Sequence, residues 1–131
     1  MRRALLFLNP RSRHGSTIAA DIAIRRLEES GLRVLQYPNS DHRDVAPLIR
    51  SHAPEIDCVI VGGGDGSINA ALEGLLATRL PLGVLPLGTG NDFARTLGIP
   101  SDLAAAADII VGSKIRAVDV GEINDRFFVN V

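Results

Sequence analysis

A glycine-rich turn at residues 62–67, with the sequence Gly-Gly-Gly-Asp-Gly-Ser, is the group of residues best suited to do chemistry. Four glycines within five positions let the backbone approach a ligand closely and leave amides free at the start of the helix that should follow. Such amides bind phosphate, although an exposed helix N-terminus contributes only about 0.3–1 kcal/mol per anion. A polyphosphate would therefore also need a metal ion and cationic side chains.

Two side chains of this turn carry functional groups. Asp65 could contact a metal or accept a proton, whereas Asp65 and Ser67 could each simply cap the following helix. A helix cap does not require four glycines. The turn does not match the dinucleotide fingerprint G-x-G-x-x-G, and no Walker lysine follows it, so a less common kind of phosphate-binding loop is indicated.

A second glycine-bearing loop, Pro-Leu-Gly-Thr-Gly-Asn-Asp, occupies residues 86–92. A short helix is expected directly after it, at residues 93–97, and carries Arg95. Capping that helix accounts for either Asn91 or Asp92, but not for both residues together with the two glycines. This loop is therefore a second candidate for ligand binding.

A third polar loop, Asn-Pro-Arg-Ser-Arg-His-Gly-Ser, lies near the start of the chain at residues 9–16. Arg11, Arg13 and His14 could bind phosphate, but each of these loop residues taken alone is more often a solvated surface charge. The two serines of this loop could likewise be helix caps.

Short apolar runs precede these loops and helical patterns follow them, which predicts strand–helix units and a mostly parallel sheet. The expected strands are Ala4–Leu8, Arg33–Tyr37, Ile56–Val61 and Leu82–Leu85. Because loops at the carboxyl ends of parallel strands line one edge of a sheet, we expect the three polar loops to face one ligand-binding space.

Helices are expected between these strands from apolar residues at helical spacing. Their apolar faces are Ile18, Ile22 and Leu27, then Val45–Ile49, then Ile68, Leu72, Leu75 and Leu76, and an alanine-rich helix follows at Asp102–Val111. After Lys114 the pattern changes to two strands around an Asn-Asp turn. The last of these strands stops at Val131 without a turn, so we expect the natural sequence to continue.

Composition restricts the class of protein. A chain of 131 residues with 46% hydrophobic residues can bury one core, so one domain is expected. A formal net charge of −1 argues against a nucleic-acid groove or a polybasic membrane patch. The single cysteine, Cys58, excludes an intrachain disulfide and lies in an apolar run where a buried thiol is expected. No stretch is long and apolar enough to span a membrane, which favours a cytoplasmic protein.

Two blocks of the sequence match a known family. Gly-Gly-Asp-Gly-Ser at residues 63–67, with Pro-Leu-Gly-Thr-Gly-Asn-Asp-Phe-Ala-Arg at residues 86–95, resembles the diacylglycerol kinase catalytic domain, a group that includes sphingosine, ceramide and bacterial lipid kinases. Asn9-Pro10 with Gly15 and the segment 118–121 extend the likeness to nearly the whole chain. Gly-Gly-Asp-Gly alone is shared with NAD kinases and phosphofructokinases, whereas the second block favours lipid kinases.

The resemblance implies a three-layer α/β/α nucleotide-binding domain over residues 1–131, like that of NAD kinases and phosphofructokinases. Residues 114–131 would then begin the connection to an absent β-rich domain. The implied activity is ATP-dependent transfer of a phosphoryl group, with Mg²⁺, to a hydroxyl of diacylglycerol or a similar lipid, in transient contact with a membrane surface. Because relatives carry a candidate base and much of the lipid site in the second domain, we expect this chain alone to bind nucleotide without turnover.

The family's nucleotide-binding residues can be carried over by position. The residues that would hold the phosphates are Asn9, Gly63, Gly64, Asp65, Gly66 and Ser67, with Gly88 and Thr89 nearby. Ser40 and Arg43 resemble residues that approach the nucleotide, although a helix cap and a surface charge would explain them as well. Ser67 replaces the commoner threonine and keeps the hydroxyl.

Three aspartates, Asp65, Asp92 and Asp119, match a family network of metal, water and domain-junction contacts. Three nearby carboxylates repel each other unless cations or hydrogen-bond donors intervene, which is consistent with a metal site, and Arg95 could be a counterion. The resemblance leaves open whether Asp65 assists the metal or the acceptor hydroxyl.

Two alternatives remain at the level of the sequence. A relative of NAD kinase would share Gly-Gly-Asp-Gly but would phosphorylate a soluble nucleotide. A regulatory module would bind nucleotide without catalysis. The sequence predicts neither the identity of the lipid nor the oligomeric state.

Overall fold

Four parallel strands form the central sheet of the structure, a computed structural model that describes residues 2–8, 17–38, 41–88, 91–112, 117–118, 120–123 and 126–128. The strands are β1 (Arg3–Leu8), β2 (Arg33–Pro38), β3 (Cys58–Gly63) and β4 (Leu82–Pro86), in the spatial order β2-β1-β3-β4. The strand order therefore reverses between β1 and β3. In open parallel sheets, ligands bind beside the carboxyl ends of the strands at such a reversal.

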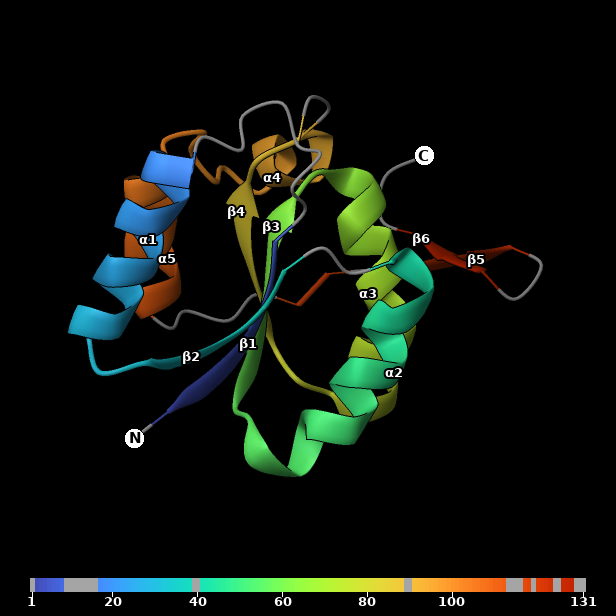
Figure 1. Ribbon diagram of the computed structural model, residues 1–131. Helices are drawn as coiled ribbons and strands as arrows, with labels where there is room; N and C mark the ends of the chain where they lie inside the picture. The colour runs from blue at the N-terminus through green and yellow to red at the C-terminus, as the bar shows by residue number, and fades with distance from the viewer. Residues whose placement is uncertain are drawn as a thin grey trace.

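Helices cover both faces of this sheet (Figure 1). The helices are α1 (Thr17–Glu29), α2 (His42–His52), α3 (Asp65–Thr78), α4 (Asp92–Thr96) and α5 (Leu103–Gly112), with a 3₁₀ turn, η1, at Ala53–Glu55. Helices α1 and α5 pack together on one face, and α2 and α3 pack together on the other. The expected three-layer α/β/α architecture is confirmed.

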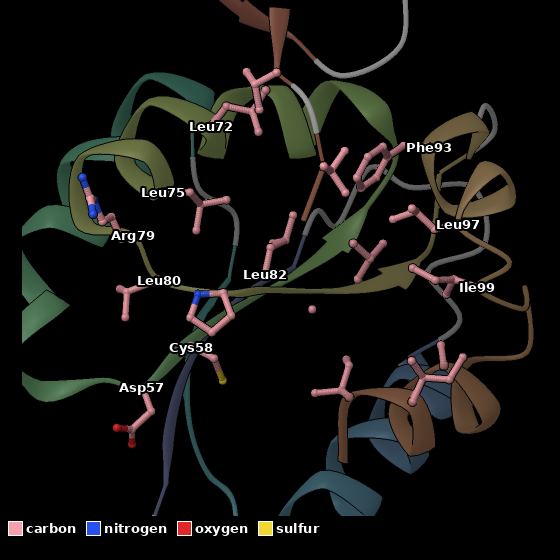
Figure 2. A pocket seen from close by; sticks show the side chains of 18 of the residues that line it. Asp57, Cys58, Leu72, Leu75, Arg79, Leu80, Leu82, Phe93, Leu97 and Ile99 are labelled. Atoms are coloured by element: carbon pink, nitrogen blue, oxygen red, sulfur yellow. The ribbon is translucent and has the colours of Figure 1, made fainter. Parts of the chain in front are cut away.

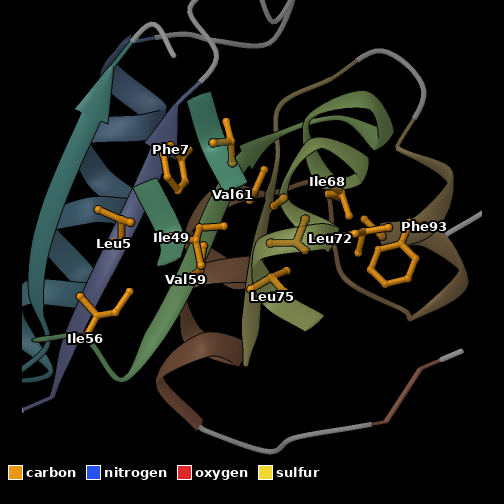
Figure 3. Close-up of a cluster of buried hydrophobic side chains, with 14 residues drawn as sticks. Leu5, Phe7, Ile49, Ile56, Val59, Val61, Ile68, Leu72, Leu75 and Phe93 are labelled. Carbon is orange, nitrogen blue, oxygen red and sulfur yellow. The ribbon is translucent and has the colours of Figure 1, made fainter. Parts of the chain in front are cut away.

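Side chains of the central strands alternate between two apolar cores because successive residues of a strand point to opposite faces. In β1, Leu5 and Phe7 join the core beneath α2 and α3, which Figure 3 shows, whereas Ala4 and Leu6 join the core beneath α1 and α5. Burial on both faces explains why these strands are continuous apolar runs rather than alternating patterns.

The apolar face predicted for α1 is only partly correct. Leu27 is fully buried, but Ile18 and Ile22 are 73% and 46% exposed, and Ala20 and Ala23 take the buried positions instead. Small side chains suit this contact because α1 packs against the alanine-rich helix α5. The rule that large apolar residues mark the buried face of a helix fails where two helices meet through alanines.

A similar correction applies to α3. Ile68, Leu72 and Leu75 are buried as predicted, whereas Leu76 is 47% exposed. Consecutive helical residues lie about 100° apart around the axis, so Leu75 and Leu76 do not share one narrow face.

We expect the Ile60→Ala substitution to lower the free energy of unfolding by about 2–5 kcal/mol, because it leaves a cavity in the core. Ile60 is fully buried in β3. The matched change Ile22→Ala should cost much less, about 1 kcal/mol at most, since that residue is 46% exposed and lies outside the core. Urea unfolding of both variants tests the pair, and equal losses would contradict the assignment of Ile22 to the surface.

The predicted pair of strands near the end of the chain is present. Strand β5 (Gly121–Ile123) pairs antiparallel with β6 (Arg126–Phe128), and the Asn-Asp turn itself lies outside the described residues. The hairpin is separate from the four-stranded sheet and projects beside α3 (Figure 1). Among the helices that the structure describes, none is long and apolar enough to cross a membrane.

Candidate functional site

The glycine turn lies where strand β3 ends and helix α3 begins. Gly63 is the last residue of β3, and Asp65 is the first residue of α3. Gly64 is the N-cap residue and, as a glycine, makes no side-chain capping hydrogen bond to α3. The first turn of α3 is thus presented at the carboxyl edge of the sheet, which is the arrangement expected of a phosphate-binding helix N-terminus.

Asp65 caps a different helix from the one in which it lies. Its Oδ2 accepts a hydrogen bond from Asp92 N at 3.1 Å, and its Oδ1 accepts one from Phe93 N at 3.0 Å. These two amides are the first of α4, so the carboxylate satisfies donors that a helix start leaves unpaired. The alternative in which Asp65 caps α3 is therefore wrong.

Asn91 was one of two candidate caps of α4, and the structure gives its side chain a different role. Asn91 makes no capping hydrogen bond to α4. Its side chain instead binds both backbone groups of Gly88: Oδ1 accepts from Gly88 N at 3.0 Å, and Nδ2 donates to Gly88 O at 2.7 Å. Asn91 thereby binds the donor and the acceptor of Gly88 at the same time.

The two glycine loops touch each other through their backbones. Leu87 N donates a hydrogen bond to Gly63 O at 3.2 Å. A Cβ atom placed on Gly88 would overlap Gly64 Cα and lie 2.7 Å from Gly64 N. Only a residue without a side chain permits this approach.

Asp92 and Arg95 form an ion pair on the surface of α4. Both side chains are more than 60% exposed, so the pair contributes little to stability. Arg95 was expected as a counterion of the aspartates, and it serves Asp92 in that way. The carboxylate of Asp65 is held by backbone amides rather than by a described cation.

The start of α2 lies beside the glycine turn because α2 packs closely on α3. A Cβ atom on Gly74 would lie 2.9 Å from Ala46 O, which shows how closely the two helices approach. At their N-terminal ends, a Cβ atom on Gly66 would lie 3.7 Å from His42 Cε1. His42 is a neighbour of the turn that the sequence did not indicate, because it belongs to no motif.

Arg43, a predicted nucleotide-binding residue, is held by the cap of α2. Asp41 Oδ1 accepts hydrogen bonds from Arg43 N at 2.9 Å and Arg43 Nε at 3.2 Å, and Arg43 Nη2 donates to Asp41 Oδ2 at 3.0 Å. These hydrogen bonds raise the pKa of Arg43 and lower the pKa of Asp41 from 3.8 to about 2. The guanidinium remains in solvent, 89% exposed, at the carboxyl edge of the sheet.

A titration tests this pair. We expect the pKa of Asp41 to be about 2, and we expect Arg43→Gln to raise it toward 3.8, because the guanidinium bonds to the ionised carboxylate are lost. A depressed pKa adds stability that is present above pH ~4 and is lost as the pH falls through the folded-state value. NMR titration of the Asp41 carboxyl carbon measures both values. An unchanged pKa in Arg43→Gln would contradict the pairing.

The predicted site residues divide into those that the structure describes and those outside it. Asp65, Asp92 and the run Gly63–Ser67 lie together with Gly88 at one edge of the sheet. Arg43 lies on the neighbouring helix α2. The predicted residues outside the described part of the chain are Asn9, Ser40, Thr89 and Asp119.

A metal site made by protein side chains alone finds limited support. Within the described residues, no group of three His, Cys, Asp or Glu side chains could hold a metal ion together. Of the predicted metal residues, Asp65 and Asp92 are in contact, and the contact joins the Asp65 carboxylate to the Asp92 backbone amide. Mg²⁺ commonly keeps several waters and takes only one or two carboxylates, so the Asp65 carboxylate is compatible with Mg²⁺ bound largely through water.

An apolar cavity of about 780 Å³ lies between α3, α4 and β4 (Figure 2). Leu75, Leu82, Phe93 and Leu97 line it, and Cys58 lies toward its other end. Cys58 is half-buried rather than fully buried as predicted, and burial raises the pKa of its thiol. The apolar lining near α4 does not suit phosphate, so this cavity is distinct from the glycine-loop site.

Comparison with known proteins places this arrangement in a family. The family model "Diacylglycerol kinase catalytic domain" matches residues 3–123. The chain belongs to the diacylglycerol kinase catalytic domain family. A diacylglycerol kinase from Mycobacterium tuberculosis is 42% identical over 120 residues, covering 89% of this chain and 39% of the relative. A diacylglycerol kinase from Bacillus subtilis is 36% identical over 146 residues, covering 100% of this chain and 45% of the relative.

A solved structure agrees with this assignment. The crystal structure of a diacylglycerol kinase from Bacillus anthracis superimposes with a TM-score of 0.85 at 31% identity, covering 98% of this chain and 46% of that one. The chain thus spans less than half the length of these diacylglycerol kinase relatives. This match confirms the resemblance to the diacylglycerol kinase family that the two sequence blocks indicated.

Proposed function

We propose that this chain binds ATP with Mg²⁺ and forms the nucleotide-binding domain of a kinase that phosphorylates a hydroxyl of diacylglycerol or a similar lipid. The observation that carries the proposal is the contact between the two glycine loops, which brings Gly64, Asp65 and Gly88 together beside the N-terminus of α3. Family membership supplies the reaction class, because the matched relatives are named diacylglycerol kinases.

In this proposal the phosphates bind to the backbone of residues 63–67. The turn offers a close approach at its glycines and the first amides of α3, which suit an anion. Arg43 at the start of α2 adds a cation on the same edge. Asn9, Ser40, Gly88 and Thr89 complete the nucleotide site by the resemblance.

Asp65 and Asp92 would hold Mg²⁺ directly or through water, together with Asp119. Each oxygen of Asp65 accepts one amide hydrogen bond and keeps a second lone pair for a metal-bound water. When bound, the ion neutralises charge on the phosphates. The contribution of the protein is to hold the Asp65 carboxylate in one orientation.

The proposed reaction forms a bond between the lipid oxygen and the γ-phosphorus, breaks the bond from that phosphorus to the β–γ bridging oxygen, and releases ADP. The hydroxyl proton passes to a base. Positioning and charge neutralisation supply most of the catalysis of phosphoryl transfer. We propose that Asp65 assists at the metal or at the acceptor hydroxyl, and that the protein works at the membrane surface from the cytoplasm.

We further propose that residues 1–131 alone bind nucleotide without turnover. The chain spans 39–45% of the length of the two curated relatives, which leaves room in them for further parts of a lipid site. The connection to such parts would begin at residues 114–131.

Two measurements test the proposal. The protein at its natural full length should transfer the γ-phosphoryl group of radiolabelled ATP to diacylglycerol in mixed micelles, and NAD should not be phosphorylated in parallel reactions. Isothermal titration calorimetry of residues 1–131 should detect ATP binding that needs Mg²⁺ for full affinity. Phosphorylation of NAD but not of any lipid would overturn the lipid assignment. An absence of both activities with intact ATP binding would favour a regulatory module.

A further inference from the structure

The hydrogen bonds of Asn91 carry an inference that rests on the proposed function and deepens it. We propose that Asn91 is a positioning residue: it fixes the backbone of Gly88 against Gly64 and so sets the shape of the phosphate-binding backbone at residues 63–67. Neither the family resemblance nor the capping rules assign this role to Asn91.

The side chain of Asn91 binds Gly88 in two directions at once. One amide group of the side chain accepts from the N–H of Gly88 at 3.0 Å and donates to its carbonyl at 2.7 Å. Two opposed hydrogen bonds restrict both the position and the rotation of the Gly88 peptide groups. Asparagine carries its donor and its acceptor on two separate atoms of one short side chain, so it reaches both backbone groups of Gly88 at once.

The position of Gly88 matters because it touches the glycine turn. Gly88 is buried, and the space where its Cβ would lie is filled by Gly64. Gly64 is in turn the residue from which α3 starts, and its carbonyl accepts the hydrogen bond from Ile68 N at 3.1 Å. A displacement of Gly88 is therefore passed directly to the first turn of α3.

A second contact joins the glycine turn to the second glycine-bearing loop. Asp65, next to Gly64, holds the amides of Asp92 and Phe93, next to Asn91. Gly64 and Asp65 thus contact the second loop in two ways: Gly64 through the backbone of Gly88, and Asp65 through its carboxylate on Asp92 and Phe93. Without Asn91, the carboxylate contact would remain, but Gly88 could move relative to it.

Asn91→Ala tests this role, measured in the protein at its natural full length. We expect ATP to bind about tenfold more weakly, because two hydrogen bonds that hold the phosphate-binding backbone are lost. Adenosine, which lacks phosphates, should bind with the parental affinity. Calorimetric titration with ATP and with adenosine, in the presence of Mg²⁺, measures this difference.

Thr78→Val is the matched control. Thr78 Oγ1 donates to Gly74 O at 2.8 Å and accepts from Leu80 N at 3.4 Å, so this substitution also removes a donated and an accepted hydrogen bond to the backbone. It does so at the opposite end of α3 from the glycine turn. We expect Thr78→Val to lower the melting temperature without changing the affinity for ATP.

Asn91→Ser provides a second variant in case Asn91→Ala folds poorly, since a shorter hydroxyl cannot span both groups of Gly88. Parental ATP affinity in either folded Asn91 variant would overturn the positioning role. An equal loss for ATP and adenosine, or an equal loss in Thr78→Val, would overturn it as well, because both outcomes indicate general destabilisation. If the parent protein itself did not bind ATP, the proposed function would be wrong, and the role of Asn91 that rests on it would be wrong as well.

Discussion

Gly88→Ala should abolish most of the affinity for ATP, with a loss of at least about tenfold, and should lower the free energy of unfolding by about 1–3 kcal/mol. The new methyl group would overlap Gly64 Cα and lie 2.7 Å from Gly64 N. Both clashing atoms belong to the backbone, so no side-chain rotation relieves them. The two loops must separate, and the first turn of α3 must move with Gly64.

Gly112→Ala is the control for this substitution. A Cβ on Gly112, at the end of α5, would meet nothing within 4 Å, and Gly112 does not have a positive φ. The control should leave the affinity for ATP unchanged and should leave stability unchanged or slightly increased. Calorimetry with ATP and urea unfolding measure the two effects. Parental affinity in Gly88→Ala would show that the contact between the glycine loops does not shape the nucleotide site.

The architecture followed from the sequence because its causes are local and repeated. Each strand was a short apolar run, and the largest boundary error was in β3, which begins at Cys58 rather than at Ile56. Ile56 is nevertheless buried, since it leads from the 3₁₀ turn η1 into the sheet. An apolar run predicts burial more directly than it predicts strand pairing.

The helix faces were less predictable, because they depend on the partner of each helix. In α1, Ile18 and Ile22 were predicted to lie on the buried face. The structure buries Ala20 and Ala23 instead. The buried face of α1 is set by its contact with α5, because the small residues Ala106 and Ala107 of α5 allow the two helices to approach closely. A helix taken alone does not reveal which neighbour it will meet.

The membership of the site was predictable, but its internal connections were not. The sequence predicted that the two glycine loops lie at one edge of the sheet, and the structure confirms this. Capping rules offered Asp65, and either Asn91 or Asp92, as caps of the helix that follows each, because those rules consider only local partners. The actual partners of Asp65 lie 27 and 28 residues away in the sequence.

These long-range contacts give α4 an unusual degree of constraint for a helix of five residues. Its first amides are bound by Asp65, and Phe93 is buried in the core beneath α2 and α3. A helix this short is not stable on its own, so its place depends on these contacts. Asp65 is therefore both a proposed site residue and a support of the start of α4 at Asp92 and Phe93.

Asp65→Ala should lower the kinase activity of the full-length protein by about a hundredfold or more, since small displacements of groups that position phosphates and metal are that costly. The same change should lower the free energy of unfolding by about 0.5–2 kcal/mol, because α4 loses its cap. Asp65→Asn separates the two roles: its amide oxygen can still accept one of the two backbone hydrogen bonds, but its NH₂ group faces the other donor and its charge is lost. We expect Asp65→Asn to recover part of the stability and little of the activity.

The control for both Asp65 variants is Asp102→Ala. Asp102 Oδ1 accepts a hydrogen bond from Ala104 N at 3.2 Å at the start of α5, so its loss removes a cap and a negative charge in a helix outside the glycine-loop site. Radiometric lipid phosphorylation and urea unfolding, measured for all three variants, separate a lost cap from a lost site. If Asp102→Ala lost as much activity as Asp65→Ala at equal stability, or if Asp65→Ala kept the parental rate, the carboxylate of Asp65 would have no part in the reaction, and its two hydrogen bonds to α4 would be its whole function.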